Sequence, residues 1–311
     1  MRVFLTGATG YVGSAVAEGL LRAGHEVVGL TRSEESLESL EERGVRARAG
    51  SIEDPGLIAR LAAECEAVIH AAAPTEDPAA AEEALLRGVR ESFRQSEVPF
   101  VYTSGGWVMG ETPAGETATE ESSLRPPPAL SWRPEVERRV LAEEGLRTVV
   151  VRPALVYGKV GDPSGSVVDD LLQWARAAGG TARFVTKPDP DEDHLWTMVH
   201  REDLGDFYAR LLQRLRAKAP LSAALDGQVF LCTSGEPVRV EEVARAVSRA
   251  VSQEAGGEAR PWPLDEARRE LGEYADSLAL SQRLSDAKAR RMLGWQPGSP
   301  TVFDELAAIS S

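Results

Sequence analysis

The first half of the chain alternates short apolar runs with longer amphipathic stretches. Six runs of four or five residues are rich in apolar and β-branched side chains, which favours short strands buried within a sheet. The predicted strands are Val3–Thr6, Glu26–Leu30, Val45–Ala49, Ala67–His70, Phe100–Thr103 and Thr148–Arg152.

The stretches between these runs place apolar residues three or four positions apart, the spacing of one helix face. The predicted helices are Val12–Arg22, Glu34–Glu42, Leu57–Ala63, Ala80–Gln95 and Pro134–Glu143. Strands that alternate with helices indicate βαβ units. The pattern therefore predicts an α/β fold, a Rossmann-type doubly wound parallel sheet.

The alternation of strands and helices is interrupted after the fifth predicted strand. Glu111–Pro134 is rich in Thr, Glu and Pro and is predicted to be a loop over the edge of the sheet. After Tyr157 the alternation becomes irregular, with helices expected at Val167–Ala178, Arg201–Leu215, Val240–Val251 and Leu284–Leu293. We expect a dinucleotide-binding domain at 1–156 plus about 200–232, and a smaller, mainly C-terminal α/β part that covers the substrate at about 157–199 plus 233–311.

A glycine-rich turn joins the first predicted strand to the first predicted helix. Gly7, Gly10 and Gly13 stand in Gly7-Ala8-Thr9-Gly10-Tyr11-Val12-Gly13, with a strand before, a helix after and a second strand at Glu26–Leu30. Such a turn lets backbone amides approach a pyrophosphate, to which the helix N-terminus adds the positive end of its dipole. We therefore predict that Gly7, Thr9, Gly10, Tyr11, Val12 and Gly13 bind a dinucleotide.

Other segments follow this turn in a characteristic order: Val68-Ile69-His70-Ala71-Ala72-Ala73, Arg152-Pro153-Ala154-Leu155-Val156-Tyr157-Gly158, Val199-His200-Arg201-Glu202-Asp203-Leu204 and Lys288-Ala289-Arg290-Arg291-Met292-Leu293-Gly294-Trp295. Together with the glycine turn they resemble the extended short-chain dehydrogenases/reductases, which include sugar epimerases and dehydratases. The resemblance covers nearly the whole chain. It implies a nicotinamide cofactor, with Ala71, Ala72, Ala73, Thr103, Ser104 and Pro153 lining its site, and a homodimer is usual in the family.

The residues after the second strand bear on which nicotinamide cofactor is used. Folds of this kind that take NAD usually have a carboxylate there, whereas this chain has Thr31-Arg32-Ser33. A guanidinium at Arg32 would grip the 2′-phosphate of NADP, although a solvated surface arginine is the alternative. We expect NADP in preference to NAD, with Ser51 and Ile52 beside the adenine; Ile52 is equally explained as a core residue.

The residues that carry chemistry in the family are missing. The resemblance implies a tyrosine that exchanges the substrate's proton, a lysine four residues later and a hydroxyl after the fifth strand. This chain has no tyrosine between Tyr102 and Tyr157 and no lysine before Lys159. One alignment puts Ala129 and Arg133 at the two helix positions, and a shifted, poorer one puts Trp132 and Val136 there, so neither restores the pair. Gly105 falls at the hydroxyl position.

Other residues are candidates for the missing roles. Thr103 and Tyr157 are candidate proton donors, although a packing residue on the pocket wall is the favoured interpretation of Tyr157. Arg133 either holds the nicotinamide ribose or is a solvated cation. Trp107, Met109 and Trp132 suggest an apolar substrate pocket, unless they are ordinary core residues.

The composition limits the kinds of partner that the protein is expected to bind. A net charge of −14 argues against nucleic acid, and no apolar run is long enough to span a bilayer. The chain opens on a strand without a leader pattern, so a cytoplasmic location is expected. Cys65 and Cys232 suggest neither a disulfide nor a zinc site, and the loop Asp189–His194 is interpreted as solvated, so no metal is predicted.

Two functions from different classes remain. The first is an atypical NADP(H)-dependent oxidoreductase that acts on a small carbonyl or conjugated substrate, with the proton from Tyr157, Thr103 or water. The second is a catalytically silent sensor that binds the same cofactor. The sequence leans toward the enzyme, because aromatic residues suggest that a ligand other than the cofactor binds.

Overall fold

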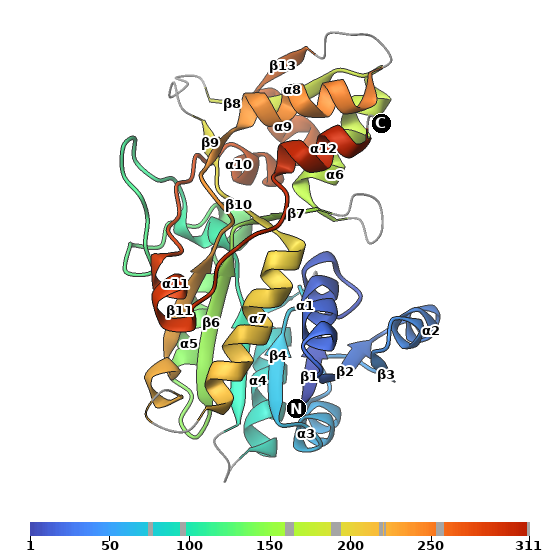
Figure 1. Ribbon diagram of the computed structural model, residues 1–311, viewed down its shortest axis with the longest axis vertical. Coiled ribbons are helices and arrows are strands. Elements are labelled where there is room, and N and C mark those ends of the chain that lie inside the picture. Colours follow the sequence, from blue (N-terminus) through green and yellow to red (C-terminus); the bar gives the residue numbers. More distant parts are fainter. Residues whose placement is uncertain are drawn as a thin grey trace.

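The computed structural model describes residues 1–73, 77–93, 98–158, 165–187, 194–217, 220, 222–252 and 258–309. Its centre is a seven-stranded sheet in which every neighbouring pair is parallel (Figure 1). The strand order is β11-β6-β5-β4-β1-β2-β3. The bounds are β1 Arg2–Thr6, β2 Glu26–Thr31, β3 Arg46–Ala49, β4 Ala67–His70, β5 Pro99–Thr103, β6 Arg147–Pro153 and β11 Gln228–Cys232. The predicted fold class is confirmed, and β11 adds a strand that the sequence pattern did not predict.

Successive side chains of the central strand point to opposite faces of the sheet. Val3 and Leu5 lie in one hydrophobic cluster, whereas Phe4 lies in another, and all three are fully buried. The same alternation continues in β4, β5 and β6. A strand that is buried on both faces has apolar residues at consecutive positions, which explains the short unbroken runs in the sequence.

Helices cover both faces. One face carries α1 Tyr11–Arg22, α2 Glu34–Glu42, α7 Arg201–Arg216 and α11 Ala287–Leu293, and the other carries α3 Pro55–Ala63, α4 Pro78–Ser92 and α5 Arg133–Leu141. The axes of α1 and α7 approach closely where Gly19 meets Gly205: a Cβ on Gly19 would lie 2.3 Å from the Gly205 backbone. These two glycines therefore allow the helix pair that supports the start of α1.

The order of the strands reverses beside β1. The chain runs outward from β1 to β2 and β3 on one side, then crosses to β4, β5 and β6 on the other. Open α/β sheets bind ligands at such a switch point, beyond the carboxyl ends of the strands.

A smaller part lies beyond that edge of the sheet in Figure 1 and has its own hydrophobic cluster. Its helices are α6 Val167–Ala177, α8 Val240–Val251, α9 Leu264–Leu271, α10 Tyr274–Leu278 and α12 Val302–Ile309. Its strands pair as β8 Ala182–Thr186 with β13 Ala259–Pro263, β7 Leu155–Tyr157 with β10 Met198–His200, and β9 Leu195–Trp196 with β12 Val238–Arg239. The segment with Leu284, Leu293 and Trp295 packs instead in the hydrophobic cluster on the α1 and α7 face of the sheet, although we expected it in the smaller part.

Two predicted boundaries shift for local reasons. The helix expected from Leu284 begins at Ala287, because Leu284 makes a bridge to Ala118 and its amide donates to Thr197 Oγ1. The helix expected from Ala80 begins at Pro78, where the Asp77 side chain accepts from the Ala80 amide. Its predicted end at Gln95 lies outside the described residues.

Candidate cofactor-binding and active site

The glycine turn is packed backbone to backbone at the switch point between β1 and β4. Gly7 has a φ of 77°, and a Cβ there would lie 2.5 Å from the backbone of Ala71 and Ala72. A Cβ on Gly13 would lie 2.0 Å from the Gly7 carbonyl oxygen. Two of the three glycines are therefore required by contact, and they hold the turn against the end of β4.

The start of α1 is open toward the carboxyl edge. Gly10 is its N-cap residue and offers no side chain to accept from the first-turn amides, and the first turn carries no acidic residue. Thr9 and Gly10 are exposed. Amides without a capping group, at the positive end of a helix dipole, form an arrangement that can bind an anion.

Side chains from distant segments fix this helix start. The Tyr11 hydroxyl donates to the Gly158 carbonyl oxygen. Arg201, which is 2% exposed, donates to Ser14 Oγ at 3.1 Å and to Glu18 at 2.9 Å. Our sequence analysis gave Arg201 no role, although the segment that contains it was noted.

The other predicted cofactor residues stand at the ends of neighbouring strands. Their positions are Thr31 and Arg32 at the end of β2, Ser51 and Ile52 after β3, Ala71–Ala73 after β4, Thr103 and Ser104 at the end of β5, and Pro153 at the end of β6. Parallel strands bring these ends to one edge, which is also where the glycine turn lies.

Arg32 lies at the outer end of this row. Its side chain is exposed, and within the described residues no carboxylate forms an ion pair with it. The next residue, Ser33, caps α2 by accepting from the Ser36 amide, so the helix start does not use the arginine.

The end of β5 differs from the sequence-based expectation in its hydrogen bonds. Thr103 Oγ1 lies 2.6 Å from the Tyr208 hydroxyl, and both groups are buried. Ser104 Oγ is buried without a partner among the described residues, whereas a Cβ on Gly105 would meet open space. The free space is therefore at Gly105, and the Thr103 hydroxyl is already bonded.

The start of α5 stands beside this point. Ala129 lies in a short 3₁₀ turn, and Arg133 begins α5. The Arg133 guanidinium donates to the Thr103 carbonyl oxygen at 3.4 Å and lies 4.8 Å from the centre of the Trp132 ring. Arg133 thus reaches the end of β5 from the helix.

Further along α5, a buried ion pair joins the helix to β6. Glu137 and Arg152 have side chains 2% and 5% exposed, with 2.5 Å between Glu137 Oε2 and Arg152 Nη2. This pair lies one turn of the helix beyond Arg133, and its contacts are with the core.

Tyr157 is 3% exposed and its hydroxyl donates to the Pro300 carbonyl oxygen at 2.9 Å. Its ring meets His200 edge to face at 5.2 Å. Burial raises the pKa of Tyr157, so the phenol stays protonated at neutral pH. Its predicted role as proton donor stays a prediction, as does that of Thr103.

The three residues expected in a substrate pocket lie in different surroundings. Met109, which is 3% exposed, packs in the core of the α1 and α7 face and accepts a hydrogen bond from Arg152. Trp132 packs against the α4 and α5 face, whereas Trp107 packs against the smaller part. The structure does not bring the three together, because only Trp107 crosses from the sheet toward α10.

A buried polar chain beneath the site was missed by our sequence analysis. Thr6 Oγ1 lies 2.6 Å from His70 Nδ1, and His70 Nε2 lies 3.1 Å from Glu82. His70 and Glu82 are 0% and 2% exposed. The chain links the ends of β1 and β4, just before the turn and the alanine segment, to α4.

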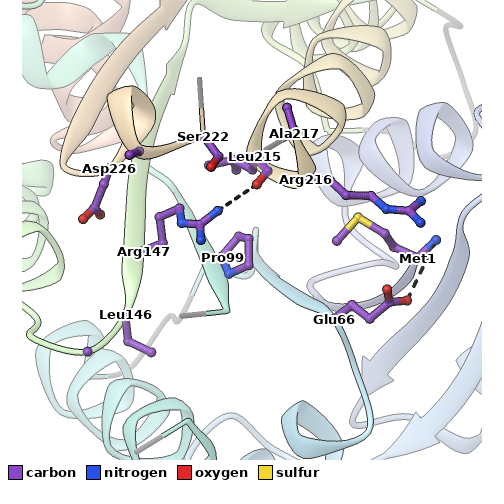
Figure 2. Close-up of a pocket in the computed structure, with 12 residues that line it drawn as sticks. Met1, Glu66, Pro99, Leu146, Arg147, Leu215, Arg216, Ala217, Ser222 and Asp226 are labelled. Carbon is purple, nitrogen blue, oxygen red and sulfur yellow. Dashed lines mark hydrogen bonds and ion pairs between the residues drawn. The ribbon is translucent and has the colours of Figure 1, made fainter. Parts of the chain in front are cut away.

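A cavity of about 650 Å³ lies at the opposite edge of the sheet (Figure 2). Its lining includes Met1, Pro99 and Arg147, which begin the chain, β5 and β6. In Figure 2 Arg147 donates to the Leu215 carbonyl oxygen across this space, at 2.7 Å. The cavity is therefore separate from the glycine turn and is not a site for the predicted cofactor.

The described part of the chain has neither a candidate metal site nor a helix able to cross a membrane. No group of three or more His, Cys, Asp or Glu side chains there is placed to hold a metal ion, and most of the predicted solvated loop Asp189–His194 lies outside that part. None of the helices in it combines the length and apolar character needed to cross a membrane.

Comparison with known proteins identifies the family. The model of the NAD dependent epimerase/dehydratase family matches residues 3–224. The chain is 28% identical to UDP-glucose 4-epimerase of Mycolicibacterium smegmatis, covering 96% of this chain and 94% of the relative. It is 27% identical to 2-alkyl-3-oxoalkanoate reductase of Stenotrophomonas maltophilia, covering 96% and 95%.

Its fold is similar to that of UDP-glucose 4-epimerase of Thermus thermophilus, solved in complex with NAD. The TM-score is 0.75 at 24% identity, and 99% of each chain is covered. The chain is also 27% identical to an uncharacterized protein of Schizosaccharomyces pombe, over 99% of both. With its parallel sheet, its glycine turn and a family match over most of its length, the chain belongs to the NAD-dependent epimerase/dehydratase family and is an NAD(P)-dependent oxidoreductase-like protein.

Proposed function

We propose that the protein is an NADP(H)-dependent oxidoreductase that reduces a small carbonyl compound without the tyrosine–lysine pair of its family. The observation that carries this proposal is the glycine turn. Gly7 and Gly13 leave no room for a side chain, and α1 begins without a capping group. A backbone packed in this way presents amides to a diphosphate, and the residues present fit a dinucleotide.

Arg32 supports the preference for NADP over NAD. An exposed guanidinium at the end of β2, with no carboxylate bound to it in the described part of the chain, is free to bind a 2′-phosphate with two hydrogen bonds. Ser51 and Ile52 follow the adjacent strand and would contact the adenine. Arg133 reaches the end of β5 and would hold the nicotinamide ribose.

The chemistry that remains is a hydride transfer and a proton transfer. When bound, the reduced nicotinamide supplies the hydride to the carbonyl carbon. The carbonyl oxygen takes its proton from water that reaches the open space beside Gly105, since the hydroxyls of Thr103 and Tyr157 are engaged with Tyr208 and Pro300. The product is the alcohol and the oxidised cofactor.

The test has two readouts. Titration calorimetry with NADPH and NADH should show binding of both and tighter binding of NADPH. The absorbance of the reduced nicotinamide should then fall when the protein is given a panel of aldehydes, ketones and enones. Absence of any heat with either cofactor would overturn the proposal. Binding without turnover across the panel would support cofactor binding and contradict the proposed reduction of a carbonyl compound.

A specific observation favours a second candidate, a sensor of the cofactor's redox state. Ala129 and Gly105 offer no proton, and the hydroxyls of the two candidate donors, Thr103 and Tyr157, are already bonded. A sensor should bind NADPH and NADP with different affinities and turn over none of the panel. The homodimer expected from the family remains part of this proposal, and light scattering of the purified protein tests it.

A further inference from the structure

A carboxylate and two aromatic rings form a cluster beside the open space at Gly105. Trp107, two residues after Gly105, meets Tyr274 of α10 with ring centres 5.9 Å apart and planes at 68°. The Tyr274 hydroxyl donates to Asp170 Oδ2 of α6 at 2.8 Å. All three side chains are half-buried, so each keeps some surface in contact with solvent.

The cluster spans the two ends of the candidate site. A Cβ on Gly165 would lie 3.2 Å from Tyr11 Cβ, which places the start of α6 beside the start of α1. Asp170 follows in the first turns of α6, and Trp107 extends from the end of β5. In Figure 1, α6 and α10 lie on the side of the smaller part that faces the sheet.

Asp170 has no positive partner among the described residues. Its Oδ1 has no hydrogen bond there, and no arginine or lysine of the described chain forms an ion pair with it. The charge that acts on Asp170 is that of Asp169, whose carboxylate accepts from the Ser166 amide and hydroxyl in a capping box. Burial raises the pKa of Asp170, the hydrogen bond from Tyr274 partly offsets this, and the charge of Asp169 raises it further. A cation beside Asp170 would relieve this cost.

We propose that Asp170, Trp107 and Tyr274 form a subsite for a positively charged organic group of the substrate, such as a substituted ammonium. Aromatic faces attract cations, and the Asp170 oxygen that has no hydrogen bond in the described part of the chain supplies the opposite charge. A divalent metal ion requires more oxygen ligands than this single carboxylate offers. The same negative charge disfavours a substrate that carries a diphosphate. This inference rests on the proposed function only in placing the carbonyl of that substrate at Gly105.

The test compares three ketones of one shape class that differ in charge. Phenacyltrimethylammonium is positive, 3,3-dimethyl-1-phenylbutan-1-one is its neutral isostere, and benzoylacetate is negative. Binding is measured by quenching of tryptophan fluorescence, both with and without NADPH. The wild type should bind the cation about tenfold more tightly than the isostere, and the anion least.

Variants separate the subsite from general charge. Asp170→Asn should abolish the preference for the cation and change the affinity for the neutral ketone by less than about twofold. Trp107→Leu should weaken binding of the cation more than that of its isostere. Asp265→Asn, which removes one negative charge from an aspartate 78% exposed on α9, should leave the preference unchanged. Melting curves check that each variant is folded.

Equal binding of the cation and its isostere by the wild type, or a preference that survives in Asp170→Asn, would overturn the subsite. The result with NADPH is judged separately. If NADPH does not bind but the preference exists and depends on Asp170, the proposed function fails and the subsite stands. If NADPH binds but the cation is not preferred, the subsite fails and the proposed function is unaffected.

Discussion

The two ends of the candidate site differ in what they retain. At the β1–α1 end, the glycine turn, the alanine segment after β4 and Arg201 form a closely packed set. At the β5–α5 end the helix and its packing are equally complete, with the Glu137–Arg152 pair in the core. The sequence alignment predicts that this end has Gly105, Ala129 and Arg133 at the positions of the family's hydroxyl, tyrosine and lysine.

The difference reflects how each function is built. Cofactor binding in such folds depends on backbone amides and on glycines whose packing is part of the fold. Acid–base chemistry depends on a few side chains at the surface of a site, which can change while the helix beneath them keeps its core contacts. The fold therefore preserves binding more strongly than it preserves one particular chemistry.

The largest effect is expected at the buried pair of the β5–α5 end. Glu137→Leu leaves the Arg152 guanidinium buried without its counter-charge, so the free energy of unfolding should fall by about 3–5 kcal/mol. Denaturant unfolding measures this. Glu241→Leu, which breaks an exposed pair with Arg245, should cost at most about 1 kcal/mol. A similar loss in both variants would show that α5 is not anchored by this pair.

The second-largest effect is expected from a substitution in the glycine turn at the β1–α1 end. Gly13→Val places a side chain against the Gly7 carbonyl, so the affinity for NADPH should fall about a hundredfold, the equivalent of ~2.7 kcal/mol. Calorimetry measures the affinity, and circular dichroism checks the fold. Gly56→Ala, where the nearest atom to the new Cβ is a side-chain oxygen at 3.4 Å, should bind normally. Undiminished binding by Gly13→Val would remove the glycine turn from the site.

A substitution of Arg32 tests whether the β1–α1 end distinguishes NADPH from NADH. Arg32→Ser should weaken NADPH binding about tenfold and leave NADH binding unchanged, because only NADPH carries the 2′-phosphate. Competition between the two cofactors on one protein sample measures the ratio. Arg60→Ser, at another exposed arginine, is the control. Equal weakening of both cofactors would assign Arg32 to something other than the phosphate.

A smaller effect is expected from returning a hydroxyl to the β5–α5 end. The side chain of Gly105→Ser enters open space, so stability should change by less than about 0.5 kcal/mol. One added hydrogen bond to the carbonyl oxygen should raise turnover of a reducible substrate about threefold. Gly106→Ser, whose Cβ would lie 2.9 Å from Leu284, should instead lower the melting temperature. A slower Gly105→Ser enzyme would contradict this placement of the substrate.

The smallest effect lies on the exposed side of α5. Hydrogen bonds from Arg138 and then Arg139 lower the pKa of Glu135 to about 2. A depressed folded-state pKa gives a stabilisation that is present above the unfolded pKa of 4.5 and is lost as the pH falls toward 2. Between pH 6 and pH 3, the melting temperature of the wild type should therefore fall slightly more than that of Glu135→Gln. Parallel curves would show that the exposed pair is screened by solvent.

Local pattern and chain order were sufficient for the parallel sheet and the glycine turn. The six predicted strands recur within one residue of their bounds, because strands buried on both faces have unbroken apolar runs. Gln228–Cys232 was missed, although a turn at Asp226 and Gly227 directly precedes it. This short run follows a long connection in which strands and helices no longer alternate regularly. The position of Arg32 followed from its place after the second strand, whereas its role still awaits the cofactor test.

The sequence by itself determined which amides meet at the carboxyl edge, because the glycine turn and the strand ends are local features of a parallel sheet. Only the tertiary structure decided which side chains are available there. In the folded chain the Thr103 hydroxyl is hydrogen-bonded to Tyr208, and the Tyr157 hydroxyl to the Pro300 carbonyl oxygen. Met109 and Trp132 pack in hydrophobic clusters other than that of Trp107. The tertiary structure also brought Asp170 and Tyr274 together from positions 104 residues apart. Such contacts form between segments distant in the chain, so no local pattern of residues records them.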